Sequence, residues 1–242
     1  MKDIQSQVDH RRINIQKVGV KTVSYPVTVR DKAKKEQQTI ATLNMYVNLP
    51  HRFKGTHMSR FIEILNQFHG KIDLRNFHHI LERMKERLEA EASHLEIEFP
   101  YFLDTSYDAA SLMVRHYHCA MIGSLAESGD LRLRVRVPVT VPTTASGQGA
   151  LPRLTGHWGL AEVTVRFNTF MWIEDLLLHI EKSIETEMTA IGADGAAALS
   201  VEALTKSIGD CLNGLAEIKS YSICVENLGA DYSTFATLES LV

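Results

Sequence analysis

The stretch LPHRFKGTHMSRF, residues 49–61, joins a strand pattern to a helix pattern and decides how the first half of the chain folds. Apolar and polar residues alternate before it, and apolar residues at three- and four-residue spacings follow it. Thr56 and Ser59 lie just before the helical pattern, where hydroxyls cap a helix and unpaired amides favour a phosphate. Lys54 and Arg60 add positive charge. The stretch therefore predicts an anion site; the alternative is that Thr56 only caps the helix and both cations are solvated.

Outward from this stretch, hydrophobic periodicity predicts groups of strands and helices. Residues 18–49 predict a β-hairpin with a charged turn. Two helices should follow, at residues 59–68 and 74–95, with Gly70 as the break between them. Further strands are expected at residues 112–125, 131–140, 160–167 and 220–226, and further helices at 172–188 and 201–216.

This order of elements repeats the same logic, strands and then two helices, along the chain. We therefore expect a single chain of two structurally similar halves, at about residues 12–125 and about 131–228. No repeat is visible at the level of individual residues.

The composition of the 242 residues is that of a protein with a real core, because 45% of them are hydrophobic. The formal net charge of -3 gives no global attraction to nucleic acid or to an anionic membrane, so a local cluster must hold any anionic ligand. No stretch approaches the roughly 18 apolar residues of a membrane span, which predicts a cytoplasmic protein. The three cysteines are widely separated and indicate no disulfide framework.

Residues 49–61 are similar to the signature of the type IB GTP cyclohydrolases, in which a strand ends in LP and KGTHMSRF opens a helix. Similar segments follow in the family's order: RINIQKVGVK at 12–21, QTIA at 38–41, EFPYF at 98–102, VPVT at 137–140, WIEDLLLHIEKS at 172–183 and VEN at 225–227. The resemblance implies an α+β tunnelling fold (T-fold) with two ββαα-type halves and antiparallel sheets that assemble into an oligomeric barrel. It also implies a homotetramer with active sites at subunit interfaces.

The resemblance further implies a reaction, the metal-dependent opening of the imidazole ring of GTP with loss of formate. The expected partner is a small-molecule nucleotide or heterocycle, with no nucleic acid and no membrane. The residues expected to bind it are Lys54, Thr56, His57, Ser59, Arg60, Glu226 and Asp231.

The chain departs from the family where the metal is expected. Family members follow VPVT with CPCS, whose first cysteine ligates the metal, whereas Thr143 and Ala145 stand at the two cysteine positions here. His157 and Glu181 match the other ligands, and with Thr143 they form the expected catalytic set; the alternative is that His157 is a loop histidine and binds no metal. A threonine hydroxyl resists deprotonation and is a poor zinc ligand. A divalent metal (Zn, Mn or Fe) is therefore expected to bind more weakly than in the family.

Two further departures concern proton transfer and base recognition. Asp194 is the only candidate for a carboxylate that the family carries after the helix at 172–188. Gly229 stands where the family has the glutamate that anchors the guanine edge. Either Glu226 or Asp231 reaches in, or the ligand is not a guanine nucleotide.

His116 and His118 are two residues apart on a predicted strand and should share one face of it. Two imidazoles on one face can bind a metal or titrate near neutral pH, so this pair could add ligands to the metal site. The alternative is an exposed pair on a solvated face of the sheet. Cys119 should point the other way, into the core.

These residues leave three functions open. The first is a cyclohydrolase-like hydrolase that acts on a cyclic amidine with a metal-activated water. The second is a paralogue with changed chemistry on a different heterocyclic substrate. The third is a non-catalytic subunit that binds a nucleotide or pterin. A sequence motif argues kinship and does not by itself argue turnover.

Overall fold

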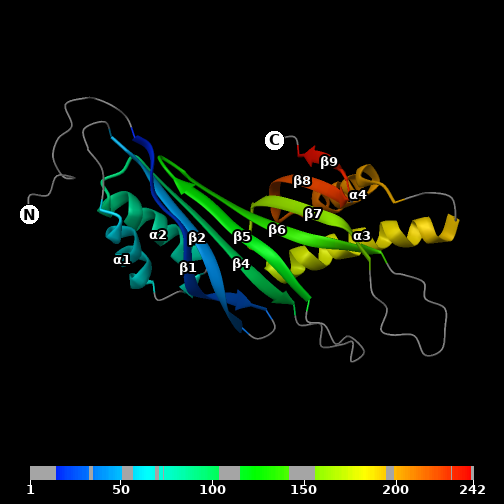
Figure 1. The fold of residues 1–242 in the computed structure, drawn as a ribbon, viewed down its shortest axis with the longest axis horizontal. Coiled ribbons are helices and arrows are strands. Elements are labelled where there is room, and N and C mark those ends of the chain that lie inside the picture. The colour runs from blue at the N-terminus through cyan, green and yellow to red at the C-terminus, as the bar shows by residue number, and fades with distance from the viewer. Residues whose placement is uncertain are drawn as a thin grey trace, which may run out of the picture. The chain divides into compact units, whose positions relative to one another are not determined.

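The computed structural model describes residues 15–32, 35–50, 57–68, 71–72, 74–103, 115–141, 156–194, 199–229 and 231–240 (Figure 1). The chain divides into two compact units, Met1–Leu133 and Arg134–Val242. No helix in these described ranges is long and apolar enough to cross a membrane.

The first unit is an antiparallel sheet with two helices packed on one face (Figure 1). Its strands pair in the order β1, β2, β4, β5, and the two-residue β3 pairs in parallel with β1. The elements are β1 (Ile15–Asp31), β2 (Lys35–Leu49), α1 (Ser59–Gln67), β3 (Lys71–Ile72), α2 (Leu74–Arg87), β4 (Ala92–Leu103) and β5 (Arg115–Leu125).

Buried and partly exposed residues alternate along the strands of this sheet, and the buried ones form the core. Along β4, Leu95, Ile97 and Phe99 are buried, and the residues between them are partly exposed. Since successive strand residues point to opposite faces, one face of β4 packs on α2 and the other stays open. Phe61 of α1 and Phe77 of α2 are almost fully buried. The helices therefore cover one face of the sheet and leave its polar face uncovered by their side chains.

The second unit has the same kind of layering. It contains β7 (Gly156–Phe167), α3 (Ile173–Asp194), α4 (Val201–Asn213), β8 (Ile218–Leu228) and β9 (Ser233–Glu239), while β6 (Gly129–Val141) crosses the boundary between the units. β7, β8 and β9 pair antiparallel, and α4 packs on α3, β8 and β9. Ser200 caps α4, because its hydroxyl oxygen accepts a hydrogen bond of 3.1 Å from the backbone N–H of Ala203.

The prediction of two ββαα halves is wrong. The strands pair in the order β3-β1-β2-β4-β5 in the first unit and β7-β8-β9 in the second, and β1 with β3 is the parallel pair among those described within the units. Strands also follow the helices in both units, β4 and β5 in the first, β8 and β9 in the second. These strands carry their own alternating apolar residues and pair with the sheet. Each unit therefore continues with strands after its helices and is not a ββαα half.

The helix predicted for residues 74–95 is too long. α2 ends at Arg87, and β4 begins at Ala92. Glu89 has a positive φ of 49° and turns the chain between the two elements. Leu95 fits the helical spacing of the residues before it, although it belongs to the strand. Its side chain is part of the alternating apolar pattern that runs to Leu103. Strand β9 was not predicted.

Gly159 on β7 gives a testable prediction about the second unit. It pairs with Asn227 on β8, and a Cβ at this position would lie 2.1 Å from the backbone oxygen of Glu226. Gly159→Ala should therefore force the two strands apart and lower the free energy of unfolding by about 1–3 kcal/mol. Urea unfolding followed by circular dichroism measures this change.

The matched control is Gly214→Ala, because a Cβ there would meet its nearest atom at 3.4 Å, and the backbone of Gly214 is α-helical with φ of -77°. We expect this variant to unfold at the wild-type urea concentration or slightly above it. Equal stability of the two alanine variants would contradict the close approach of β7 and β8.

Candidate functional site

The start of α1 brings three of the predicted binding residues together. His57 and Arg60 are partly buried and Ser59, the first helical residue, is exposed. Met58 occupies the N-cap position, and no side chain caps the helix there. Ser59 therefore lies inside the first turn and not before it. Lys54 and Thr56 lie outside the described residues, as part of 51–56.

Two backbone amides at this helix start are already used. The N–H of Arg60 donates to the carbonyl of His57 at 3.1 Å, and the N–H of Phe61 donates to the carbonyl of Met58 at 3.2 Å. An anion at this position would therefore depend on side chains more than on a row of unpaired amides. His57 also has a further interaction partner within the chain.

The predicted residues of the second unit lie on two of its elements and the turn after one of them. Glu226 is partly exposed on β8, where it pairs with Leu160 of β7 and Phe235 of β9. Asp231 is exposed in the turn after β8. Glu181 is partly buried on α3 and has an interaction partner.

The side chains near Glu226 on β8 include a second carboxylate and a guanidinium group. Cys224 lies two residues before it and on the same face of β8. Burial first, and then the charges of Glu162 and Glu226, raise the pKa of the Cys224 thiol. The guanidinium Nε of Arg136 donates to a carboxylate oxygen of Glu162 at 2.7 Å. Glu226 therefore lies on a sheet face that is crowded with negative charge and partly balanced by Arg136.

Gly229 has no room for a side chain. A Cβ at this position would lie 2.4 Å from the backbone oxygen of Tyr232. A glutamate could stand there only if the turn between β8 and β9 moved. The local backbone therefore favours glycine at position 229.

The described residues do not complete a three-ligand zinc site. Thr143 lies outside them, the side chains of His157 and Asp194 are not described, and Glu181 is the one metal candidate of the catalytic set whose side chain is placed. No group of three or more His, Cys, Asp or Glu side chains in the described part of the chain could hold a metal ion.

The two histidines of β5 share one face, as predicted. Both His116 and His118 are exposed, and their ring centroids lie 5.9 Å apart in an edge-to-face arrangement. The ring of Phe102 on β4 lies 6.2 Å from that of His116. Cys119 is buried on the opposite face, where burial raises the pKa of its thiol, which confirms its expected place in the core.

The sequence analysis missed a stacked cluster on the open face of the first unit. The rings of Tyr46 and His94 stack at 4.5 Å, and the ammonium of Lys17 lies 4.9 Å from the centroid of the Tyr46 ring. Nε2 of His94 lies 2.9 Å from the amide oxygen of Asn48, so this nitrogen carries the proton that is donated. The pairing of β2 with β4 places Tyr46 opposite His94, and no sequence pattern reveals that register.

His94 predicts a pH dependence of stability. Burial first, and then the charge of Lys17, lower the pKa of His94 below its ordinary value of 6.5. The folded state therefore favours neutral His94. This contribution is fully present above pH 6.5 and is lost as the pH falls through the lower, folded-state pKa. Urea unfolding at a series of pH values should show less acid destabilisation for His94→Gln than for the wild type; identical pH profiles would contradict it.

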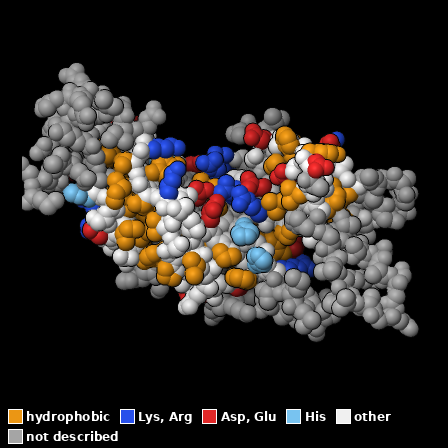
Figure 2. All heavy atoms as spheres, viewed as in Figure 1, with side chains coloured by type: hydrophobic (Ala, Val, Ile, Leu, Met, Phe, Trp, Pro, Cys, Tyr) orange, Lys and Arg blue, Asp and Glu red, His pale blue; other side chains and the backbone are white. Residues whose placement is uncertain are grey.

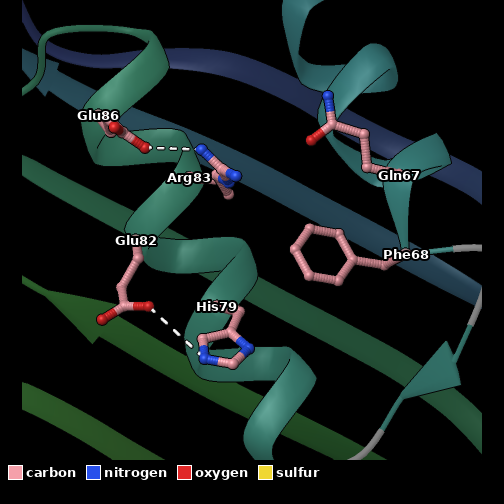
Figure 3. A pocket seen from close by; sticks show the side chains of 6 residues that line it. All are labelled: Gln67, Phe68, His79, Glu82, Arg83 and Glu86. Atoms are coloured by element: carbon pink, nitrogen blue, oxygen red, sulfur yellow. Dashed lines mark hydrogen bonds and ion pairs between the residues drawn. The ribbon is translucent and has the colours of Figure 1, made fainter.

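The pocket in Figure 3 lies on the outer side of the two helices of the first unit. Its volume is about 640 Å³, and its lining residues are Gln67, Phe68, His79, Glu82, Arg83 and Glu86. Within it Nε2 of His79 lies 3.9 Å from Glu82, and Arg83 donates to Glu86 at 3.0 Å. These side chains are about half exposed and pair along one helix, as on a solvated helix face. None of the predicted site residues lines it.

Comparisons with known proteins agree on a family. The family model described as type I GTP cyclohydrolase folE2 matches residues 1–191. The GTP cyclohydrolase FolE2 of Syntrophus aciditrophicus (strain SB) is 40% identical over 253 residues, which cover 99% of each chain. That of Geobacter metallireducens is 50% identical over 187 residues, which cover 75% of this chain and 70% of the relative.

Among solved structures the similar ones are urate oxidases. The enzyme from Bacillus sp. TB-90 aligns with a TM-score of 0.60 at 9% identity, over 93% of this chain and 99% of that one. The uricase from Arthrobacter globiformis aligns with a TM-score of 0.56 at 8% identity, over 94% and 92%. At such low identity the likeness concerns the fold alone.

These comparisons correct two expectations. The matching model and relatives carry the name FolE2, so the type IB label taken from the motif was wrong. The fold is similar to that of the urate oxidases, an antiparallel sheet with four helices, instead of two clear ββαα halves.

Proposed function

The chain belongs to the type I GTP cyclohydrolase FolE2 family, and we propose that it hydrolytically opens the ring of a purine nucleotide or a related heterocycle, with GTP as the first substrate to test. The observation that carries this proposal is the extent of the match, since one FolE2 relative aligns over 99% of both chains. The matched residues 1–191 include the KGTHMSRF segment, His157 and Glu181.

We assign the phosphates of the substrate to the segment at residues 54–60. Lys54 and Arg60 supply charge, and Thr56, His57 and Ser59 supply hydrogen-bonding groups. The start of α1 supports this assignment, because Ser59 and Arg60 lie within its first turn and His57 lies directly before its N-cap residue, Met58. Since the amides of Arg60 and Phe61 are engaged within the chain, side chains provide most of the recognition.

We assign the base edge to Glu226, with Asp231 as the second carboxylate. A carboxylate pairs well with the adjacent N–H donors of guanine, and Gly229 has no space for one. Glu226 stands on a strand and is partly buried, whereas Asp231 is exposed in a turn. A carboxylate that is held by a strand positions a ligand better than one in a turn.

We assign metal binding to His157 and Glu181, with weaker affinity than in proteins that add a cysteine ligand. Thr143, at the position of that cysteine, contributes a neutral hydroxyl. When bound, a divalent ion of zinc, manganese or iron would lower the pKa of a water molecule near the reacting ring. Asp194 is then the candidate for the carboxylate that transfers a proton in the reaction.

The test of this function is release of formate from GTP by the purified protein, compared with the variant His157→Ala. Formate release that disappears in the variant supports the proposal. The second candidate, changed chemistry or a non-catalytic nucleotide- or pterin-binding subunit, is favoured by Thr143 and by the closed space at Gly229. It predicts that both proteins bind a nucleotide or pterin and that neither releases formate from GTP.

We also propose that the chain assembles into a homotetramer. β9 is the last strand of the sheet, and Phe235 on it is 68% exposed. An edge strand with an exposed aromatic residue offers unpaired backbone groups and apolar surface that another chain can cover. Sedimentation velocity should therefore show a species of about four times the 27.2 kDa chain mass. A single 27.2 kDa species at micromolar concentration would contradict the assembly.

A further inference from the structure

The histidine pair of β5 has no part in the proposed reaction, yet it is well placed to bind a cation. His116 and His118 point to the same face of the strand, and both are exposed. Their ring centroids are 5.9 Å apart. Figure 2 shows exposed histidine side chains, in pale blue, on the face of the molecule that it draws.

The separation of the two rings fits a shared metal ion. A zinc–nitrogen bond of about 2.1 Å places the ion about 3.2 Å from the centroid of each imidazole, so two tetrahedral ligands have centroids about 5.2 Å apart. The observed 5.9 Å is therefore close to the value needed. Exposed histidine side chains can close this difference by small rotations, because their terminal torsion has a broad range.

The partner strand does not compete for the two imidazoles. The register of β4 with β5 places Phe102 opposite His116 and Pro100 opposite His118. Neither histidine has a carboxylate directly opposite it on that strand. The ladder of β4 with β5 runs without a break from Ser93 to Leu103, so the backbone holds the two side chains at a fixed spacing.

We propose that His116 and His118 form a surface site for a late first-row divalent ion, with Zn²⁺ as the ion to test. The proposed site uses neither His157 nor Glu181. The described residues gather no third His, Cys, Asp or Glu ligand there, so water completes the coordination. Two imidazoles favour Zn²⁺, Ni²⁺ and Cu²⁺ and give no advantage to Mg²⁺ or Ca²⁺, which prefer oxygen ligands.

The experiment is titration of the metal-free full-length protein with Zn²⁺ alone, by isothermal calorimetry. It uses a background of His157→Asn with Glu181→Gln, so that the metal site of the proposed function does not contribute. One ion per chain should bind, and His116→Asn or His118→Asn should each weaken its affinity by at least about tenfold. Mg²⁺ should not bind at the same concentrations. Circular dichroism verifies that each variant is folded.

The matched control is the double variant His78→Asn with His79→Asn, which removes the other adjacent histidine pair, on α2. Nε2 of His78 lies 3.4 Å and Nε2 of His79 lies 3.9 Å from a carboxylate oxygen of Glu82. Zinc binding should be unchanged in this control. Loss of binding in the control, full binding in the His116 and His118 variants, or no binding in the background protein would each overturn the proposal. None of these outcomes depends on whether GTP is hydrolysed.

Discussion

Thr143→Cys should raise the zinc affinity of the protein by about 100-fold or more, a larger change than removal of an outer-shell partner usually causes. A thiolate replaces a hydroxyl that resists deprotonation, and on the proposed assignment His157 and Glu181 provide two further ligands. The measurement is zinc content per chain by mass spectrometry after dialysis against a weak chelator. Turnover of GTP need not rise in parallel, because Gly229 still offers no side chain to the base.

The matched control is Thr144→Cys, which adds a thiol one position away and should leave zinc content nearly unchanged. An equal rise in zinc content for both variants would mean that any thiol added to this segment binds zinc. It would contradict the assignment of Thr143 to the position of the metal-binding cysteine. Tight zinc binding by the unmodified protein would show that another residue supplies the third ligand.

Arg60→Glu should weaken the binding of GTP by about tenfold to 100-fold, because it removes a charge-assisted hydrogen bond and adds a repulsive charge beside the triphosphate. The first turn of α1 holds Arg60 partly buried next to His57. Calorimetry with GTP and with inorganic triphosphate measures the change. Both ligands should lose affinity by similar factors, since the arginine is assigned to the phosphates.

Lys206→Glu is the control for this charge reversal. Lys206 is exposed on α4, and its replacement by glutamate changes the net charge by the same amount. Its affinity for GTP should stay within about twofold of the wild type at physiological salt, where distant surface charges are screened. If both variants lowered the affinity for GTP equally, the effect would be due to net charge. If Arg60→Glu left the affinity unchanged, the assignment of the phosphates to the start of α1 would be wrong.

Much of the fold was predictable because alternation and helical spacing are properties of short segments. The hairpin of β1 and β2, helix α1 and helix α4 all lie where their periodicity places them. The boundary between α2 and β4 was not predictable, because Leu95 satisfies both periods. β9 was missed because every residue of this strand is at least partly exposed, so it carries no buried apolar alternation.

The candidate site was less accessible to sequence reasoning. The shared face of His116 and His118 followed from strand geometry alone. The stack of Tyr46 on His94 depends on the register between β2 and β4, which no local pattern contains. The closed space at Gly229 likewise depends on the backbone of Tyr232, three residues later in the turn.

The most direct test of the central claim is formate release from GTP by the purified protein, with and without added Zn²⁺, Mn²⁺ or Fe²⁺. We expect slow release that rises with added metal and disappears in His157→Ala. Formate release equal to that of His157→Ala at every metal concentration would contradict the assignment of this chain as a cyclohydrolase.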